Sequence, residues 1–139
     1  MKKSILIFFL ATIFMSCSKN EEETTIPQEL IGSWQFKGIY SHDIYDENGP
    51  VFFPVLDGSS VITFNNNHTF NQVLNNYEYS GTFSVIDGNK LKISYNPNPN
   101  GLTGGGSSKI TLLTESELRL SCLSEVSCDV SRYEKVASN

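Results

Sequence analysis

Apolar and polar residues alternate over most of the chain, and this period of two predicts β-strands. The clearest example flanks the turn sequence Asp87-Gly88-Asn89. Apolar or small residues occupy every second position from Tyr77 to Val85 before the turn and from Leu91 to Tyr95 after it. The residues between them are polar, which is typical of an antiparallel hairpin with one buried face and one wet face.

The same alternation predicts further short strands, which cover residues 33–40, 60–64, 69–74, 110–112, 118–120 and 129–136. In the first of them the alternation breaks near Gly38, which predicts a bulge or a bend. Before it, Pro27-Gln28-Glu29-Leu30-Ile31 predicts one helical turn that Gly32 can end.

No helical segment interrupts these strands, so each one pairs most simply with the next. We therefore predict an all-β fold: a single antiparallel up-and-down barrel of about eight strands, closed so that no edge stays exposed, behind a short N-terminal helical turn. Segments 43–54 and 96–108 remain as rim loops, and we interpret Gly104-Gly105-Gly106 as a flexible stretch. The domain is expected to span residues 27–139.

A different pattern occupies the N-terminus. Lys2 and Lys3 precede an uncharged apolar run from Ile5 to Met15, which is too short for a transmembrane helix of about 20 residues. We predict a cleavable signal peptide over residues 1–16. Its end, Phe14-Met15-Ser16-Cys17, resembles the lipobox of bacterial lipoproteins, which implies diacylglycerol and palmitate on Cys17 and a membrane anchor. An ordinary signal peptide cleaved elsewhere is the alternative.

Residues 17–26 are polar and acidic and read as a lipidated, solvated tether. Glu21-Glu22-Glu23 resembles the surface-export signal of Bacteroidetes lipoproteins, and Ser18 is not the aspartate that resembles an inner-membrane retention signal. These resemblances imply an outer-membrane lipoprotein exposed at the cell surface. A charge run that merely stays hydrated is the alternative interpretation of the three glutamates.

The segment Leu30-Ile31-Gly32-Ser33-Trp34 contains a Gly-x-Trp sequence at the start of the first strand, and this resembles the lipocalin signature. Three further segments resemble the lipocalin-like lipoproteins of Bacteroidetes, so that the likeness spans nearly all of residues 30–136: Ile62-Thr63-Phe64-Asn65, Gly81-Thr82-Phe83-Ser84 and Ile110-Thr111-Leu112-Leu113.

This resemblance implies that Trp34 closes the narrow end of the barrel and that an arginine from a late strand packs over its ring, with Arg132 as the candidate. If Val130 faces inward, the period of two turns Arg132 inward and Tyr133 outward, unless a bulge intervenes. The alternative is that Trp34 is ordinary core and Arg132 lies on the surface.

An eight-stranded barrel is just wide enough either to fill with side chains or to hold one small ligand. The aromatic residues expected to face inward suit both cases: Phe36, Phe64, Phe70, Tyr77, Tyr79, Phe83 and Tyr95. Our first hypothesis is that they line a cavity for a small apolar or amphipathic molecule. The alternative is a filled barrel whose rim loops contact an envelope protein or a glycan.

Cys122 and Cys128 bracket a five-residue loop between the last two strands. Thiols oxidise in the compartment that the signal peptide implies, so we predict a disulfide between them. The spacing is not Cys-x-x-Cys, which argues against a redox role.

Charge and motifs exclude other functions. The chain has 10 Lys and Arg against 15 Asp and Glu, with the basic residues scattered, so nucleic acid is not an expected partner. No nucleophile, phosphate-loop or metalloprotease motif occurs, and we expect neither an enzyme nor a cofactor. The acidic cluster around His42 lacks the spacing of a calcium loop, so no metal is expected. We expect a monomer.

Overall fold

The computed structural model describes residues 23–56, 60–97, 104–124 and 128–137. The expected signal peptide, Cys17 and most of the expected tether lie outside these residues. Within the described ranges, no helix has the length and apolar character needed to cross a membrane.

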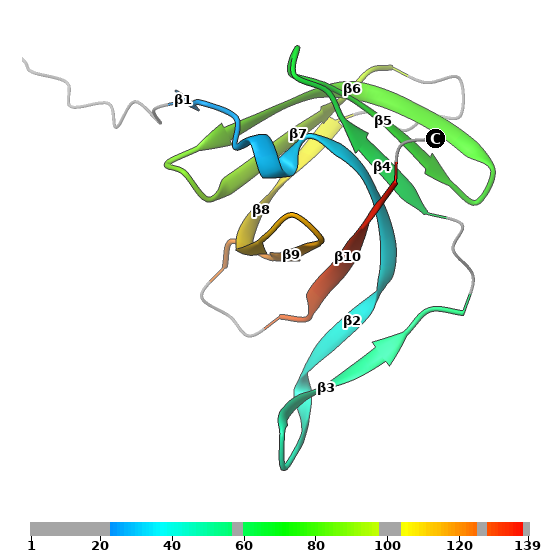
Figure 1. Ribbon diagram of the computed structural model, residues 1–139, viewed down its shortest axis with the longest axis vertical. Helices are drawn as coiled ribbons and strands as arrows, with labels where there is room; N and C mark the ends of the chain where they lie inside the picture. Colours follow the sequence, from blue (N-terminus) through cyan, green and yellow to red (C-terminus); the bar gives the residue numbers. More distant parts are fainter. Residues whose placement is uncertain (1–22, 57–59, 98–103, 125–127, 138–139) are drawn as a thin grey trace, which may run out of the picture.

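The described residues form one 3-10 helix and ten strands: β1 (Glu23–Thr24), η1 (Gln28–Leu30), β2 (Gly32–Asp46), β3 (Gly49–Pro54), β4 (Val61–Phe64), β5 (Thr69–Leu74), β6 (Tyr77–Ile86), β7 (Lys90–Tyr95), β8 (Gly104–Leu113), β9 (Glu117–Ser121) and β10 (Val130–Val136). The pairings are antiparallel, and the ring runs through β2 and then β4 to β10 before β10 pairs back with β2. The predicted all-β up-and-down barrel, with its helical turn, is confirmed (Figure 1).

The hairpin around Asp87 is confirmed, with Phe83 opposite Ile93 and Val85 opposite Leu91 on the inner face. The predicted bulge is also present. Gly38 pairs with Arg132 and Phe36 pairs with Tyr133, so that Lys37 is an extra residue in β2.

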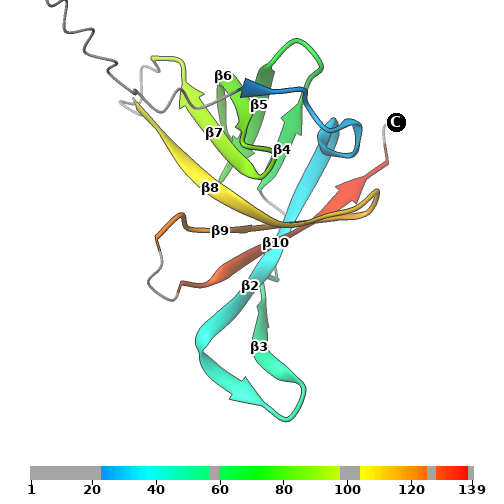
Figure 2. The same cartoon turned by 90° about the vertical axis from the view of Figure 1, so that its left-hand side faces the viewer.

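Two expected rim loops are instead strands. β2 continues to Asp46 and pairs with β3, so the loop expected over residues 43–54 is a hairpin that projects from the barrel (Figure 2). The alternation did not predict it because the register shifts between Tyr40 and Tyr45. The expected loop over residues 96–108 was wrong for residues 104–108, which pair with β7, and Gly104 to Gly106 are strand residues. Residues 98–103 lie outside the described chain.

The end of the expected tether takes part in the fold. Glu23 and Thr24 pair with Ile86 and Val85 of β6, and Ile26 is buried in the core. A polar sequence gives no sign of this strand, because its pairing is made by the backbone.

The predicted disulfide between Cys122 and Cys128 is confirmed, with a Cα–Cα distance of 6.3 Å. It connects the end of β9 to the segment before β10. The disulfide lies at the end of the barrel opposite η1, because β10 runs back from it toward Trp34.

Candidate functional site

One end of the barrel is closed by solid packing around Trp34, and we call it the closed end. The Trp34 side chain is fully buried, and its indole nitrogen donates a hydrogen bond of 2.8 Å to the carbonyl oxygen of Leu30 in η1. The other side chains with almost no exposed surface belong to the same cluster: Leu30, Phe64, Phe70, Val85, Leu91 and Leu118.

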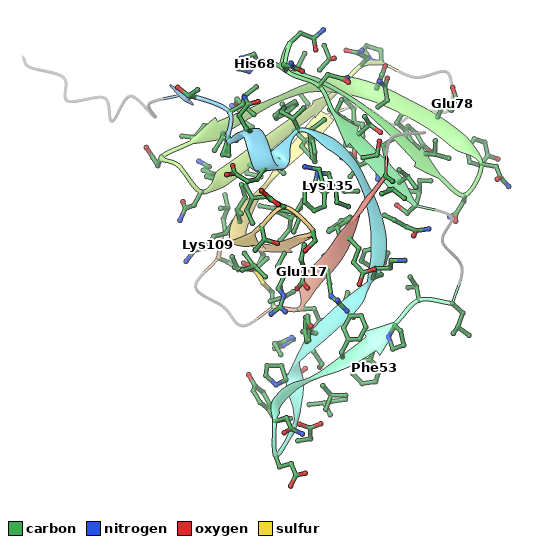
Figure 3. The ribbon with its side chains drawn as sticks, viewed as in Figure 1. Phe53, His68, Glu78, Lys109, Glu117 and Lys135 are labelled. Carbon is green, nitrogen blue, oxygen red and sulfur yellow. A yellow bond between two sulfur atoms is a disulfide. The ribbon has the colours of Figure 1, made fainter. Side chains whose placement is uncertain are left out.

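The cation over the Trp34 ring is Lys135 and not Arg132. The Lys135 Nζ lies 5.0 Å from the ring centroid and donates to the carbonyl oxygen of Glu29 at 2.8 Å. Figure 3 shows this side chain lying beside η1. Lys135 is the cross-strand partner of Trp34, and partners on paired strands share a face. The expected barrel-closing pair of Trp34 and Arg132 is therefore corrected to Trp34 and Lys135.

Arg132 lies on the outer face, because the bulge is in β2 and leaves the alternation of β10 intact. Tyr133 therefore faces inward beside Phe36, with ring centroids 5.4 Å apart. The Arg132 guanidinium packs over the Phe52 ring at 5.3 Å and forms ion pairs with Glu117 and Glu134. The expected inward position of Arg132 was wrong by one residue of register.

We expect Lys135→Ala to lower the free energy of unfolding by about 1 kcal/mol, because a partly buried cation over a tryptophan ring contributes about that much. Lys135→Arg keeps the charge and serves as the control. Urea denaturation followed by circular dichroism measures both. An equal loss in the two variants would contradict the stacking role of Lys135.

The other half of the barrel differs, and we call it the open half. Its inward-facing residues are only partly buried, although their side chains point toward the barrel axis. They are Phe36, Ile39, Gln72, Tyr79, Ile93, Tyr95, Leu120, Ser131 and Tyr133. None of these side chains carries a charge at neutral pH.

Three tyrosines lie in the open half: Tyr79, Tyr95 and Tyr133. The Tyr95 ring lies 6.2 Å from Tyr79 and 5.2 Å from Phe70, and its hydroxyl donates a hydrogen bond of 2.8 Å to Oε1 of Gln72. Gly81 and Gly104 are the cross-strand neighbours of Tyr95. A Cβ built on Gly104 meets nothing within 4 Å, whereas the Phe70 ring already packs against Gly81.

Burial, and to a lesser extent the neighbouring Tyr95, raise the pKa of Tyr133, while a hydrogen bond with Ser131 opposes the rise. Burial and then Tyr79 raise the pKa of Tyr95. Both phenols are therefore held in the protonated, uncharged form.

These shifts predict alkaline destabilisation. A group whose folded pKa is raised stabilises the fold below its unfolded pKa, here 10.0, and that contribution is lost as the pH rises through the folded pKa. We expect the free energy of unfolding to fall above pH 10 in the wild type and to fall less in Tyr133→Phe. Denaturation at pH 9 and pH 11 tests this, and equal losses in the two proteins would contradict it.

The inner wall of β8 is made of small residues. Gly106 is the cross-strand partner of Ile93, so a side chain placed at residue 106 would point inward. A Cβ built there meets nothing within 4 Å, whereas the Cβ of a residue at Gly105 would lie 2.0 Å from the Ile93 carbonyl oxygen. There is therefore open space beside Gly106 on the face that it shares with Ile93.

The aromatic residues predicted to line a cavity fall into three groups. Phe64, Phe70 and Phe83 are buried in the core cluster and fill the closed end. Phe36, Tyr79 and Tyr95 lie in the open half. Tyr77 shares the face of Tyr79 but is 54% exposed at the start of β6, so it lies at the rim of the open half.

Gln72, Gly106 and Tyr133 belong to the open half and were not predicted. The period of two in β5 places Gln72 on the same face as Phe70, so a signal was present for that residue. The inward position of Tyr133 could be predicted only with the register of the bulge known. Gly106 has no side chain, so its sequence position does not indicate which face of the strand it occupies.

The hairpin of β2 and β3 lies at the mouth of the open half. Phe53 is the cross-strand partner of Ile39 and therefore continues the inner apolar wall beyond the barrel (Figure 3). Nearby, His42 Nδ1 lies 2.9 Å from an Asp129 carboxylate oxygen and Nε2 lies 3.1 Å from Asp43. Hydrogen bonds from the His42 side chain and backbone lower the pKa of Asp129.

A concave surface with a volume of about 410 Å³ lies on the outer face. Arg119 packs over Tyr40 at 4.6 Å within it, and Pro50 and Val130 contribute apolar surface. The Arg119 guanidinium also pairs with Glu117. This network therefore accounts for the two outer arginines as ion-paired surface residues.

Two solved structures are similar to this chain. A lipocalin-like protein from Bacteroides uniformis ATCC 8492 has 21% sequence identity and a TM-score of 0.58, over 78% of this chain and 99% of that chain. An uncharacterised protein from Bacteroides eggerthii DSM 20697 has 16% identity and a TM-score of 0.52, over 77% and 99%. No family model and no curated protein matches the chain. The fold is lipocalin-like, as the sequence resemblance implied.

Proposed function

We propose, from this lipocalin-like fold, that the chain binds one small apolar or amphipathic molecule in the open half of its barrel. The observation that carries the proposal is an inner wall that is only partly buried and that bears no charge. The core side chains of the closed end have almost no exposed surface, so we expect the ligand to enter from the end where the β2–β3 hairpin projects. Aromatic walls with a few polar groups are typical of such sites.

Gly106 offers a direct test because leucine there would occupy the open space. We expect wild-type protein to enhance the fluorescence of the neutral apolar probe N-phenyl-1-naphthylamine. Gly106→Leu should weaken probe binding by roughly ten-fold or more, since the side chain fills the site. Replacing a strand glycine also removes an entropic cost of roughly 0.5–1 kcal/mol, so the variant should remain folded.

Ser107→Leu is the matched control. Ser107 is the next residue of β8 and pairs with Lys92, so its side chain faces outward. We expect this variant to bind the probe as the wild type does. Equal probe binding by Gly106→Leu, or no binding by the wild type, would overturn the proposal.

The hairpin supports a second candidate function, contact with an envelope protein or a glycan. Large apolar side chains are exposed on it and just beyond it: Ile44, Tyr45, Phe53, Val55 and Leu56. The Val55 N–H donates a hydrogen bond to the Lys37 carbonyl oxygen of β2. Backbone groups alternate along a strand, so those of Pro50, Phe52 and Pro54 point toward the other edge of β3. Prolines have no N–H, and this edge is therefore poorly suited to strand addition.

A partner would thus contact hairpin side chains. A photo-crosslinking residue at Tyr45, compared with one at the closed-end turn residue Glu115, tests this in intact cells. Adducts formed only from position 45 would support contact through the hairpin. The same adducts from both positions would contradict it.

We further propose that the chain is an outer-membrane lipoprotein, anchored by acyl chains on Cys17 and exposed at the cell surface. The lipobox-like sequence and the acidic residues behind it support this location. Labelling with a palmitate analogue should be lost in Cys17→Ser, and protease added to intact cells should remove the domain. Labelling that persists in the variant would contradict lipidation at this residue.

A further inference from the structure

The polar side chains of the open half indicate which polar group an amphipathic ligand can place there. The Tyr95 hydroxyl donates to Gln72, and Gln72 is the cross-strand neighbour of Ile62 and Tyr79 on the inner face. The Gln72 amide group still has N–H donors, and the Tyr95 oxygen still accepts. A hydroxyl or carbonyl placed beside this pair can therefore form a hydrogen bond without breaking the one present.

A charged group of a ligand, by contrast, finds no partner of opposite charge among the described residues of the open half. No described inward-facing side chain of the open half provides a counter-ion, and burial keeps Tyr95 and Tyr133 protonated. The cation at the closed end, Lys135, is already bonded to the Glu29 carbonyl and lies over Trp34. A charge buried without a partner costs several kcal/mol. Among the described inward-facing side chains of the open half, a carboxylate finds no counter-ion, and an ammonium finds only aromatic ring faces.

The mouth adds to this discrimination. Asp129 precedes β10 at the open end. Its carboxylate contacts Nδ1 of His42, and the Asp43 carboxylate contacts Nε2 of the same ring. The chain as a whole has a net charge of −5. Anionic heads that stay at the mouth in water therefore meet carboxylates and a negative protein.

We infer that the ligand is an uncharged amphiphile whose hydroxyl or carbonyl group is bound by the Gln72–Tyr95 pair inside the open half. This inference rests on the proposed function. It narrows the apolar or amphipathic class to neutral molecules with at least one hydrogen-bonding oxygen. Fatty acids and lipid phosphates fall outside that class.

Displacement of N-phenyl-1-naphthylamine by four compounds that share a ten-carbon chain tests the inference on the wild-type domain at pH 8. The uncharged members are 1-decanol and methyl decanoate, and the charged members are decanoate and decylamine. We expect the uncharged pair to displace the probe at concentrations roughly ten-fold lower than the charged pair, because only the charged heads lose hydration without a partner. Equal displacement by decanoate would overturn the inference.

The double substitution Gln72→Leu with Tyr95→Phe tests the named residues. We expect the affinity for 1-decanol to fall relative to that for the probe by roughly ten-fold, because the hydrogen-bonding partners of the hydroxyl are gone. An unchanged ratio would overturn the role of the pair. If this variant does not fold, the wild-type panel still decides the charge preference. Failure of the wild type to bind the probe at all would instead count against the proposed function.

Discussion

Replacing Trp34 with alanine will lower the free energy of unfolding by about 3–5 kcal/mol, the loss typical of a buried aromatic side chain cut back to a methyl group. The side chain has no exposed surface, and the core cluster surrounds it. Its removal also leaves the Leu30 carbonyl without the indole donor. Both effects weaken the attachment of η1, which closes this end of the barrel.

Two other variants separate these effects. Trp34→Phe keeps most of the apolar volume but loses the hydrogen bond, so we expect a smaller loss, of about 1–3 kcal/mol. Phe53→Ala removes an aromatic ring of comparable size that is 43% exposed, and it should cost less than either Trp34 variant. Trp34 is the single tryptophan, so the measurement is urea denaturation followed by circular dichroism and not by fluorescence. A cost for Trp34→Ala equal to that for Phe53→Ala would contradict a closed end built on Trp34.

The sequence predicted the parts of the fold in which side chains report the face of a strand. Tyr77 to Tyr95 alternates through β6 and β7, and the pairing of Phe83 with Ile93 follows from that pattern and a tight turn. The strand residues 104–108 were not predicted because glycine and serine carry almost no hydrophobic signal. They form a strand because their backbone groups form hydrogen bonds with those of β7.

The candidate site was predicted only in part, and the reason is register. The lipocalin resemblance implied that an arginine covers Trp34, with Arg132 as the candidate. Which residue of β10 lies over the ring depends on where β2 carries its extra residue. With Lys37 as that residue, Tyr133 faces inward and the cation of β10 nearest to Trp34 is Lys135. The same bulge thus determines both the closed end and one wall of the open half.

Open space is the other property that the sequence does not contain. Seven aromatic side chains were predicted to face inward, but their number does not show which are packed and which reach water. The rings of Phe64 and Phe83 pack edge to face in the closed end, with centroids 4.8 Å apart. Tyr95 lies between two glycines in the open half, and this difference comes from strand pairing rather than from residue type.

Gly38→Ala will destabilise the fold by about 2–6 kcal/mol, because a non-glycine residue in a strained backbone conformation costs about 1–3 kcal/mol and overpacking typically costs about 1–3 kcal/mol more. Gly38 has φ +145°, and its Cβ would lie 2.2 Å from the Phe53 carbonyl oxygen and 2.9 Å from the Pro54 Cα. The neighbour is backbone, so it cannot rotate away. The substitution therefore separates β3 from β2 at the bulge.

Gly49→Ala is the matched control for Gly38→Ala. Gly49 also has a positive φ, +119°, but its Cβ would meet nothing within 4 Å. Its replacement should therefore cost only the backbone strain, about 1–3 kcal/mol. Urea denaturation of the two variants measures the difference, and the clash should make Gly38→Ala the less stable protein. Equal losses would show that β3 can move away from Gly38 at no cost, and that the hairpin at the mouth is not held by this contact.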